Sequence, residues 1–168
     1  MKKRDTYIVI AILAAVAVGF VFIDGRSGLI RLDASGATLT LRSGFFHSVM
    51  VAGNDQPMKV KARRYRPAYI HLTSDDGYQI SGSGPFGDLN PVYVKSGQTL
   101  ALKAGPPLKL KPIIRRNDSL VSISYVLVGR AGEQYQYVMK GNQRIGAPSV
   151  EIVDESGRTL ASGNFEYG

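Results

Sequence analysis

The chain contains no cysteine and no tryptophan, and histidine occurs only at His47 and His71. Without cysteine it has no disulfide, no thiolate nucleophile and no cysteine-based zinc site. That composition fits a bacterial envelope protein better than a small disulfide-stabilised secreted domain. With two histidines, few catalytic arrangements that need an imidazole base are open to it.

Acidic residues are also scarce in the middle of the chain. Between Gln56 and Arg116 there are eleven Lys and Arg but three Asp, a net charge of +8, whereas residues 1–55 carry +2 and residues 117–168 carry −2. In the alternating stretches "KVKARRYR" and "LKLKPIIRR" the cations fall on the solvent face of two expected strands. If those strands are neighbours, they form one patch for an anionic partner. The predicted patch consists of Lys59, Lys61, Arg63, Arg64, Arg66, Lys109, Lys111, Arg115 and Arg116. A solvated face that keeps the protein soluble is the alternative interpretation.

The amino terminus combines a basic segment with an apolar one. Residues 1–6 include Lys2, Lys3 and Arg4, and from Tyr7 to Ile23 seventeen consecutive residues carry no charge. As a helix this run spans about 25 Å, close to the ~30 Å hydrocarbon core of a bilayer. It predicts a transmembrane anchor over 7–23, with the amino terminus cytoplasmic and the remainder outside the cytoplasm. The apolar anchor residues are Tyr7, Ile8, Val9, Ile10, Ile12, Leu13, Val16, Val18, Phe20, Val21, Phe22 and Ile23.

Two cleavage patterns compete with an uncut anchor. The run "AVA" ending at Ala17 matches a signal-peptidase site, but six further uncharged residues follow it. Gly19, Phe20 and Asp24 match a prepilin site, yet the apolar segment lies before that cut rather than after it. The uncut anchor is therefore favoured.

The rest of the chain shows alternating apolar residues rather than helical periodicity. Runs such as "ATLTLRS", "YIHLTS" and "VSISYVLV" are separated by turn formers such as "SDDG" and "RAGE". We predict ten to twelve strands, a first one within a juxtamembrane segment at 24–36 and the others in a β-domain at 37–168. The expected class is all-β, an antiparallel β-sandwich, with a barrel as second choice. In strand count and rhythm this sandwich resembles immunoglobulin-like and transthyretin-like modules of envelope proteins.

Two stretches predict particular places in the sheets. Pro112 lies inside "LKLKP", and proline cannot donate to a strand ladder, so this strand is expected to be an edge strand or a bulged one. The tail "RTLASGNFEYG" is expected to pair with "SVEIVDE" as a closing hairpin, with Phe165 and Tyr167 packed inward.

Several motifs that suggest chemistry are better explained structurally. "GSGPFG" matches GxGxxG, but another expected strand, and no helix, follows it. Ser81 or Ser83 would need His47 or His71 as a base. His71 alternates with Ile70 and Leu72 and is expected to point outward, and the pattern gives no orientation for His47. Asp75 and Asp76, with Asp88, lack the spacing of a calcium loop, so "DDG" is read as a tight turn.

The sequence therefore predicts a binding protein and not an enzyme, with no cofactor and no metal. We expect a single-pass, extracytoplasmic adaptor or accessory subunit that docks a protein partner or an anionic envelope polymer. Nucleic acid is not expected, because few aromatics interleave with the cations. The alternative is a secreted module for carbohydrate or another small ligand, with exposed Tyr65, Tyr69, Tyr135 and Tyr137 lining a shallow groove.

Overall fold

In a computed structural model, residues 26–165 form an all-β fold of several sheets, and the described part contains one helical turn, the 3-10 helix η1 (Gly87–Leu89). The strands are β1 (Ser27–Leu32), β2 (Ala37–Ser43), β3 (His47–Ala52), β4 (Met58–Lys61), β5 (Arg64–Thr73), β6 (Tyr78–Gly82), β7 (Val92–Tyr93), β8 (Thr99–Leu102), β9 (Lys109–Asn117), β10 (Leu120–Val128), β11 (Gln134–Tyr135), β12 (Tyr137–Lys140), β13 (Gln143–Arg144), β14 (Ser149–Val153) and β15 (Thr159–Asn164).

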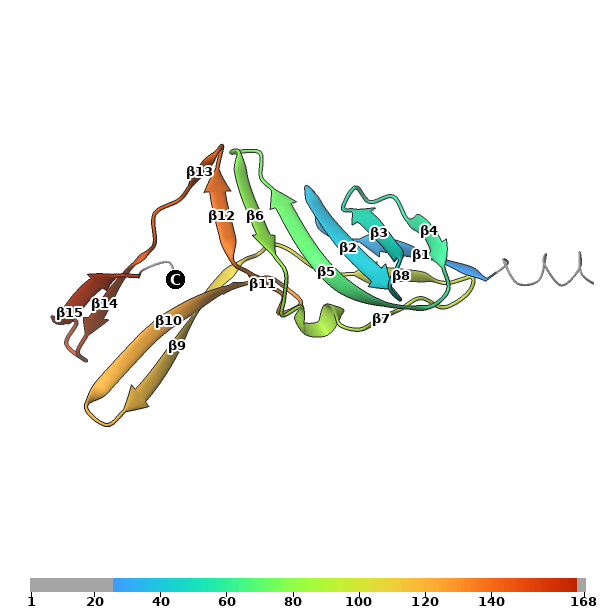
Figure 1. The fold of residues 1–168 in the computed structure, drawn as a ribbon. Coiled ribbons are helices and arrows are strands. Elements are labelled where there is room, and N and C mark those ends of the chain that lie inside the picture. Colours follow the sequence, from blue (N-terminus) through green and yellow to red (C-terminus); the bar gives the residue numbers. More distant parts are fainter. Residues whose placement is uncertain (1–25, 166–168) are drawn as a thin grey trace, which may run out of the picture.

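The strands form four hydrogen-bonded groups (Figure 1). The largest has the order β13-β12-β6-β5-β2-β3, and β7 pairs with β5 beside it. A three-stranded sheet has the order β4-β1-β8, a second has the order β11-β10-β9, and β14 pairs with β15. Most neighbouring pairs are antiparallel, in agreement with the alternation and the short turns.

One pair departs from the antiparallel prediction. β1 runs parallel to β8, with Leu29 opposite Thr99 and Leu32 opposite Leu102. Alternation shows that a strand has one apolar face, but it does not show which distant strand lies beside it. Hairpin turns indicate antiparallel neighbours, and no hairpin joins these two strands.

The core lies where β1 packs against β2 and β3. Leu39, Ile70 and Val51 come from the large sheet, Ile30 comes from β1, and all four have no exposed surface. His71 alternates with the buried Ile70 and is half-buried on the opposite face. The alternation in these strands therefore predicts the buried side correctly.

The β9–β10 hairpin extends away from this core (Figure 1). Its nine-residue strands span roughly 30 Å at the usual rise per residue. Ile114 at 66% and Leu120 at 73% exposure show that the outer half of the hairpin is uncovered. The prediction that each alternating strand buries one face is wrong here, because alternation describes a strand's two faces and not what covers them.

Two placements made from the sequence are confirmed. β9, which contains Pro112, is the edge strand of its sheet. β14 and β15 form the closing hairpin, with Ser149 opposite Asn164. Phe165 is half-buried and its ring lies 4.7 Å from that of Tyr125 in an edge-on contact. Tyr167 lies outside the described residues.

The predicted anchor over 7–23 and the basic segment over 1–6 also lie outside the described residues. Within residues 26–165, no helix has the length and apolar character needed to cross a bilayer.

Candidate interaction surfaces

The cations predicted to form one patch are divided among three sheets and fall into two groups, those of the β4–β5 region and those of β9. Lys59 and Lys61 lie on β4, which pairs with β1, and Arg64 and Arg66 lie on β5. The cations of β9 belong to the sheet that β9 forms with β10. One continuous patch required neighbouring strands, and the pairing does not meet that condition.

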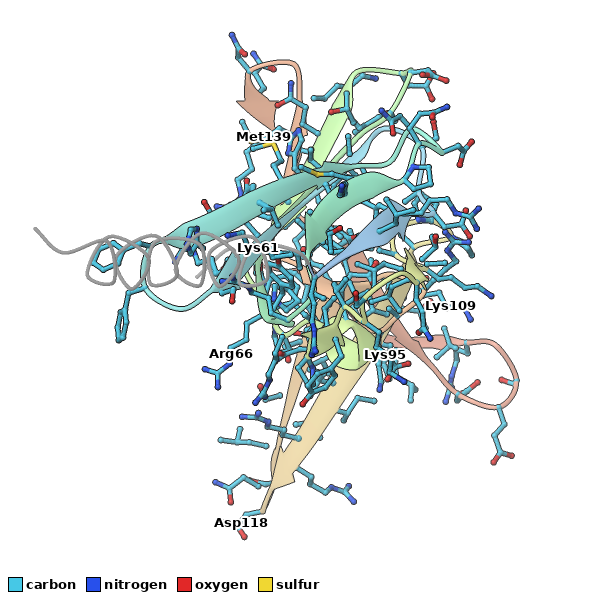
Figure 2. The ribbon with its side chains drawn as sticks, turned by 90° about the vertical axis from the view of Figure 1, so that its right-hand side faces the viewer. Lys61, Arg66, Lys95, Lys109, Asp118 and Met139 are labelled. Carbon is cyan, nitrogen blue, oxygen red and sulfur yellow. The ribbon has the colours of Figure 1, made fainter. Side chains whose placement is uncertain are left out.

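The first group, apart from Lys59, gathers at the end of the fold where β1 begins, which we call the proximal end. Ser27 pairs with Lys61, and the Ala62 amide donates to the Arg26 carbonyl at 2.8 Å. Arg42 pairs with Arg66 at the end of β2. Figure 2 looks onto this end, where Lys61, Arg66 and Lys95 are labelled. Its cations are Arg26, Arg42, Lys61, Arg63, Arg64, Arg66 and Lys95.

Two phenylalanines project from the same end. The turn between β2 and β3 carries Phe45, 100% exposed, and Phe46, 97% exposed. Beside it lies a groove of about 660 Å³ lined by Arg42, Phe45, Arg64 and Arg66, among others. The Arg64 guanidinium also lies 5.6 Å from the centre of the Tyr93 ring, a cation–π distance. The groove thus combines cations with the aromatic ring of Phe45.

The β9–β10 hairpin has one apolar and one cationic face. The register places Ile114 opposite Ile123 and Leu110 opposite Leu127, so these side chains share a face. Lys111 and its strand neighbours of the same parity, Lys109 and Arg115, lie on the other face. Over residues 109–128 the net charge is +3.

The inner part of that apolar face borders a cavity of about 220 Å³. Leu110 and Leu127 line it from the hairpin, Val138 from β12, and Ile145 and Pro148 from the segment before β14. Nearer the tip, Ile114 is 66% and Val121 is 51% exposed. The apolar face therefore begins against the fold and continues into solvent.

The β14–β15 hairpin carries the opposite charge. Residues 149–164 hold Glu151, Asp154 and Glu155 against Arg158, a net charge of −2. At its turn, hydrogen bonds from the Ser156 hydroxyl and from the Arg158 amide lower the pKa of Asp154. Ile152 is 40% exposed on this hairpin. The two projecting hairpins are thus both partly apolar and opposite in charge.

A buried glutamate holds the base of the β9–β10 hairpin. Glu133 has no exposed surface, and its carboxylate accepts hydrogen bonds from the Gly105 amide at 2.5 Å, the Ala131 amide at 2.9 Å and the Tyr135 hydroxyl at 2.9 Å. Gly105 precedes β9 and Ala131 follows β10. A single carboxylate therefore ties both ends of the hairpin to the core.

The same contact makes the stability of the folded protein decrease at alkaline pH. Burial, and then the Glu133 charge, raise the pKa of Tyr135 well above its ordinary value of 10.0. Because the folded pKa is higher, this contribution to stability is complete below pH 10 and is lost as the pH rises above it. We expect wild-type stability to fall by up to about 1.4 kcal/mol per pH unit from this group above pH 10.

Tyr135→Phe removes this ionisation, so its stability should fall less steeply with rising pH. Urea unfolding of both proteins at pH values from about 9 to 11 measures the two slopes. Tyr65, whose pKa burial also raises, titrates in both proteins and cancels in the comparison. Equal slopes would contradict the assignment to Tyr135.

The aromatic groove expected for a secreted ligand-binding module is not formed as predicted. Tyr65 is 3% exposed and its hydroxyl donates to the Lys61 carbonyl at 3.0 Å, and Tyr135 is 4% exposed. Tyr69 and Tyr137 are exposed. Alternation and composition did not distinguish these tyrosines, because the covered side of each strand depends on neighbours that are distant in the chain.

The glycine-rich loop has a packing role. A Cβ on Gly82 would lie 2.0 Å from the Gln134 carbonyl oxygen, and one on Gly87 would lie 2.0 Å from that of Ala131. The loop leads into η1, a single 3-10 turn, rather than into a helix that could bind a pyrophosphate. Glycine at these positions lets the loop approach the β10–β11 segment closely.

The remaining chemical candidates have simple surroundings. Ser81 pairs with His71 across β6 and β5, and the His71 Nε2 lies 3.2 Å from the Thr73 hydroxyl. His47 is exposed at the start of β3, and Asp75 and Asp76 form the turn after β5. Among the residues that the structure describes, no three His, Asp or Glu side chains gather as a metal site would require.

Comparison of the chain with protein-family models, with curated proteins and with solved structures finds no match.

Two features of these surfaces were not predicted from the sequence. Phe45 and Phe46 form a turn between alternating runs, and "SGFFHS" could have indicated it, since Gly44 precedes two aromatics outside the alternation. The sequence predicts a turn at "RAGE", which contains Glu133. Its burial depends on Gly105, which is far away in the chain, so no local signal reports it.

Proposed function

We propose that the protein is a single-pass membrane protein of the cell envelope with a structural or adaptor role. Residues 7–23 would be an uncut anchor with the amino terminus in the cytoplasm, and the β-domain would work outside it. The β-domain is, in this proposal, a β-sandwich of the β1 sheet and the β2–β3–β5 part of the large sheet. Support for the sandwich comes from the shared core of Ile30, Leu39 and Val51.

The observation that carries the adaptor role is the pair of projecting hairpins. A two-stranded hairpin alone is marginally stable in water and needs a covered face. On β9–β10 the apolar face runs out past the cavity with Ile114 and Val121 in solvent. A docked partner would cover this strip and hold the hairpin.

The partner that fits best is a second copy of the chain. The apolar strip of β9–β10 lies in a hairpin of net charge +3, so its complement should be apolar and acidic. The β14–β15 hairpin is such a surface, with Ile152 and Val153 exposed beside Glu151. Because the two surfaces differ, copies would join head to tail, which closes a ring or extends a fibre.

The proposed role is association and not catalysis, and it uses no cofactor. Anchoring confines each domain to the membrane plane and raises its effective concentration near other copies. An anionic envelope polymer, another protein or a small ligand would be a different occupant of these surfaces, and with any of them the particles should contain one copy of the chain.

The full chain extracted from native membranes in a mild detergent tests this proposal. We expect the chain in the membrane fraction, and its intact mass should show that its first residue lies before Val18. The particles should contain several 18.2 kDa chains. A soluble chain that begins at Val18 would overturn the anchor. Particles of one chain, or of one chain with a different protein, would overturn the second copy as partner.

A further inference from the structure

The phenylalanine turn at the proximal end has no cover within the described chain. Phe45 and Phe46 are adjacent and almost completely exposed. An aromatic side chain of this size buries 150–250 Å² when covered, so two in water represent a large unused apolar area. A single exposed residue is ordinary, but an adjacent pair at the tip of a turn forms a wedge.

Arginines surround the wedge. Arg42, Arg64 and Arg66 are exposed and line one groove with Phe45. A guanidinium presents a planar fork of donors that matches the oxygens of a phosphate, and it is more weakly hydrated than an ammonium group. The two phenylalanines at the tip of the turn and the arginines that can bind phosphate therefore lie side by side.

Several acids lie away from this end. Asp33 follows the end of β1, a strand that begins at the proximal end, and Asp75 follows the end of β5. Asp55 lies between the end of β3 and the start of β4, beyond the pair Thr38 and Ala52 at the opposite end of the sheet. The cations of the proximal end thus face an approaching anionic surface without these carboxylates.

The chain enters the fold at this same end. The backbone carbonyl of Arg26 accepts a hydrogen bond from the Ala62 amide, and the Gly97 amide donates to the Ser27 carbonyl at 2.8 Å. The uncharged run ends at Ile23, and three residues of chain reach at most about 10 Å. If the run is a membrane anchor, the proximal end lies at the membrane surface.

We propose that the proximal end docks on an anionic phospholipid surface, with Phe45 and Phe46 inserted among the acyl chains and Arg42, Arg64 and Arg66 on the headgroup phosphates. The orientation rests on the proposed anchor, whereas the wedge and its arginines are features of the described fold. Docking fixes the tilt of the domain and directs the β9–β10 hairpin, whose tip is near Asp118, relative to the bilayer (Figure 2).

The absence of tryptophan allows a direct test on the full chain. Phe46→Trp introduces one fluorophore at a 97% exposed position. Reconstituted in vesicles of phosphatidylcholine and phosphatidylglycerol, its emission should shift to the blue. Lipids with brominated acyl chains should quench it several-fold more than they quench Leu120→Trp at the hairpin tip.

Charge variants in the Phe46→Trp background test headgroup recognition. R42Q/R64Q/R66Q should lose most of the quenching, whereas K109Q/K111Q/R115Q, which removes three exposed cations from β9, should retain it. High salt should also reduce the quenching. Equal loss in both triple variants would overturn a specific site, and no loss in either would overturn phosphate binding.

Failure of the docking differs from failure of the anchor. If the protein floats with the vesicles after alkaline washing but Phe46→Trp is not quenched, the docking is wrong and the anchor stands. If alkaline washing releases the protein while Phe46→Trp is quenched before the wash, the docking stands without the anchor. An unquenched protein that does not float contradicts both.

Discussion

Replacing Glu133 with alanine is expected to lower the free energy of unfolding by about 3–5 kcal/mol. The carboxylate has no exposed surface and accepts three hydrogen bonds, from Gly105, Ala131 and Tyr135. Alanine leaves these donors buried without their partner and opens a cavity. Urea unfolding of the full chain in detergent, followed by circular dichroism, measures the loss.

Two further variants separate this network from a general effect of losing a glutamate. Glu151→Ala removes an exposed carboxylate on β14 and should change the stability by less than about 0.5 kcal/mol. Gly129→Ala should destabilise strongly, because its Cβ would lie 2.0 Å from the Glu133 Oε1. Similar stabilities for Glu133→Ala and Glu151→Ala would show that the buried carboxylate does not hold the hairpin base.

The second large effect concerns association of the chains. I114S/V121S replaces two exposed side chains on the apolar face of the β9–β10 hairpin. If a second copy covers them, each loses part of the 1.5–3 kcal/mol that burial of such a side chain contributes, so association should weaken by at least about 10-fold. Because they are exposed in the single chain, its unfolding should change little.

Sedimentation of the detergent-solubilised protein over a range of concentrations measures this change. The matched control is S122A/S124A, which alters the opposite face of β10. A charge exchange identifies the partner: Arg116→Glu and Glu151→Arg should each weaken association, and mixing the two variants should restore part of it. If the serine variant associates like the wild type, the hairpin is not the contact.

The sequence predicted strands more accurately than their surroundings. Leu39 and Ile70 are buried as their alternation indicates, and β14 and β15 pair as expected. In β9 the same alternation leaves Ile114 exposed. An amphipathic strand has the same pattern whether its own fold or another molecule covers it, so sequence alone does not separate these cases.

The candidate surfaces were predictable in composition but not in position. Arg64 and Lys111 were both identified by charge, yet they lie on different sheets. Strand order depends on pairings between residues far apart in the chain, and periodicity does not contain that information. The sequence did not identify Phe45 as part of a surface, because its turn lies beside Arg66 only through the pairing of β2 with β5.

The parallel pairing of β1 with β8 affects the order in which the protein can fold. β1 is the middle strand of its sheet, between β4 and β8. Leu32 of β1 pairs with Leu102 of β8, which is seventy residues later in the chain, so β1 has both neighbouring strands only after β8 has been made. During synthesis one edge of β1 therefore stays unpaired until most of the core sequence has emerged. Pairing of strands so far apart in the chain makes folding slow, and it leaves an unpaired strand that chaperones or neighbouring chains can bind. For a protein proposed to assemble with copies of itself, the interval before Leu102 emerges is when a wrong strand pairing is easiest.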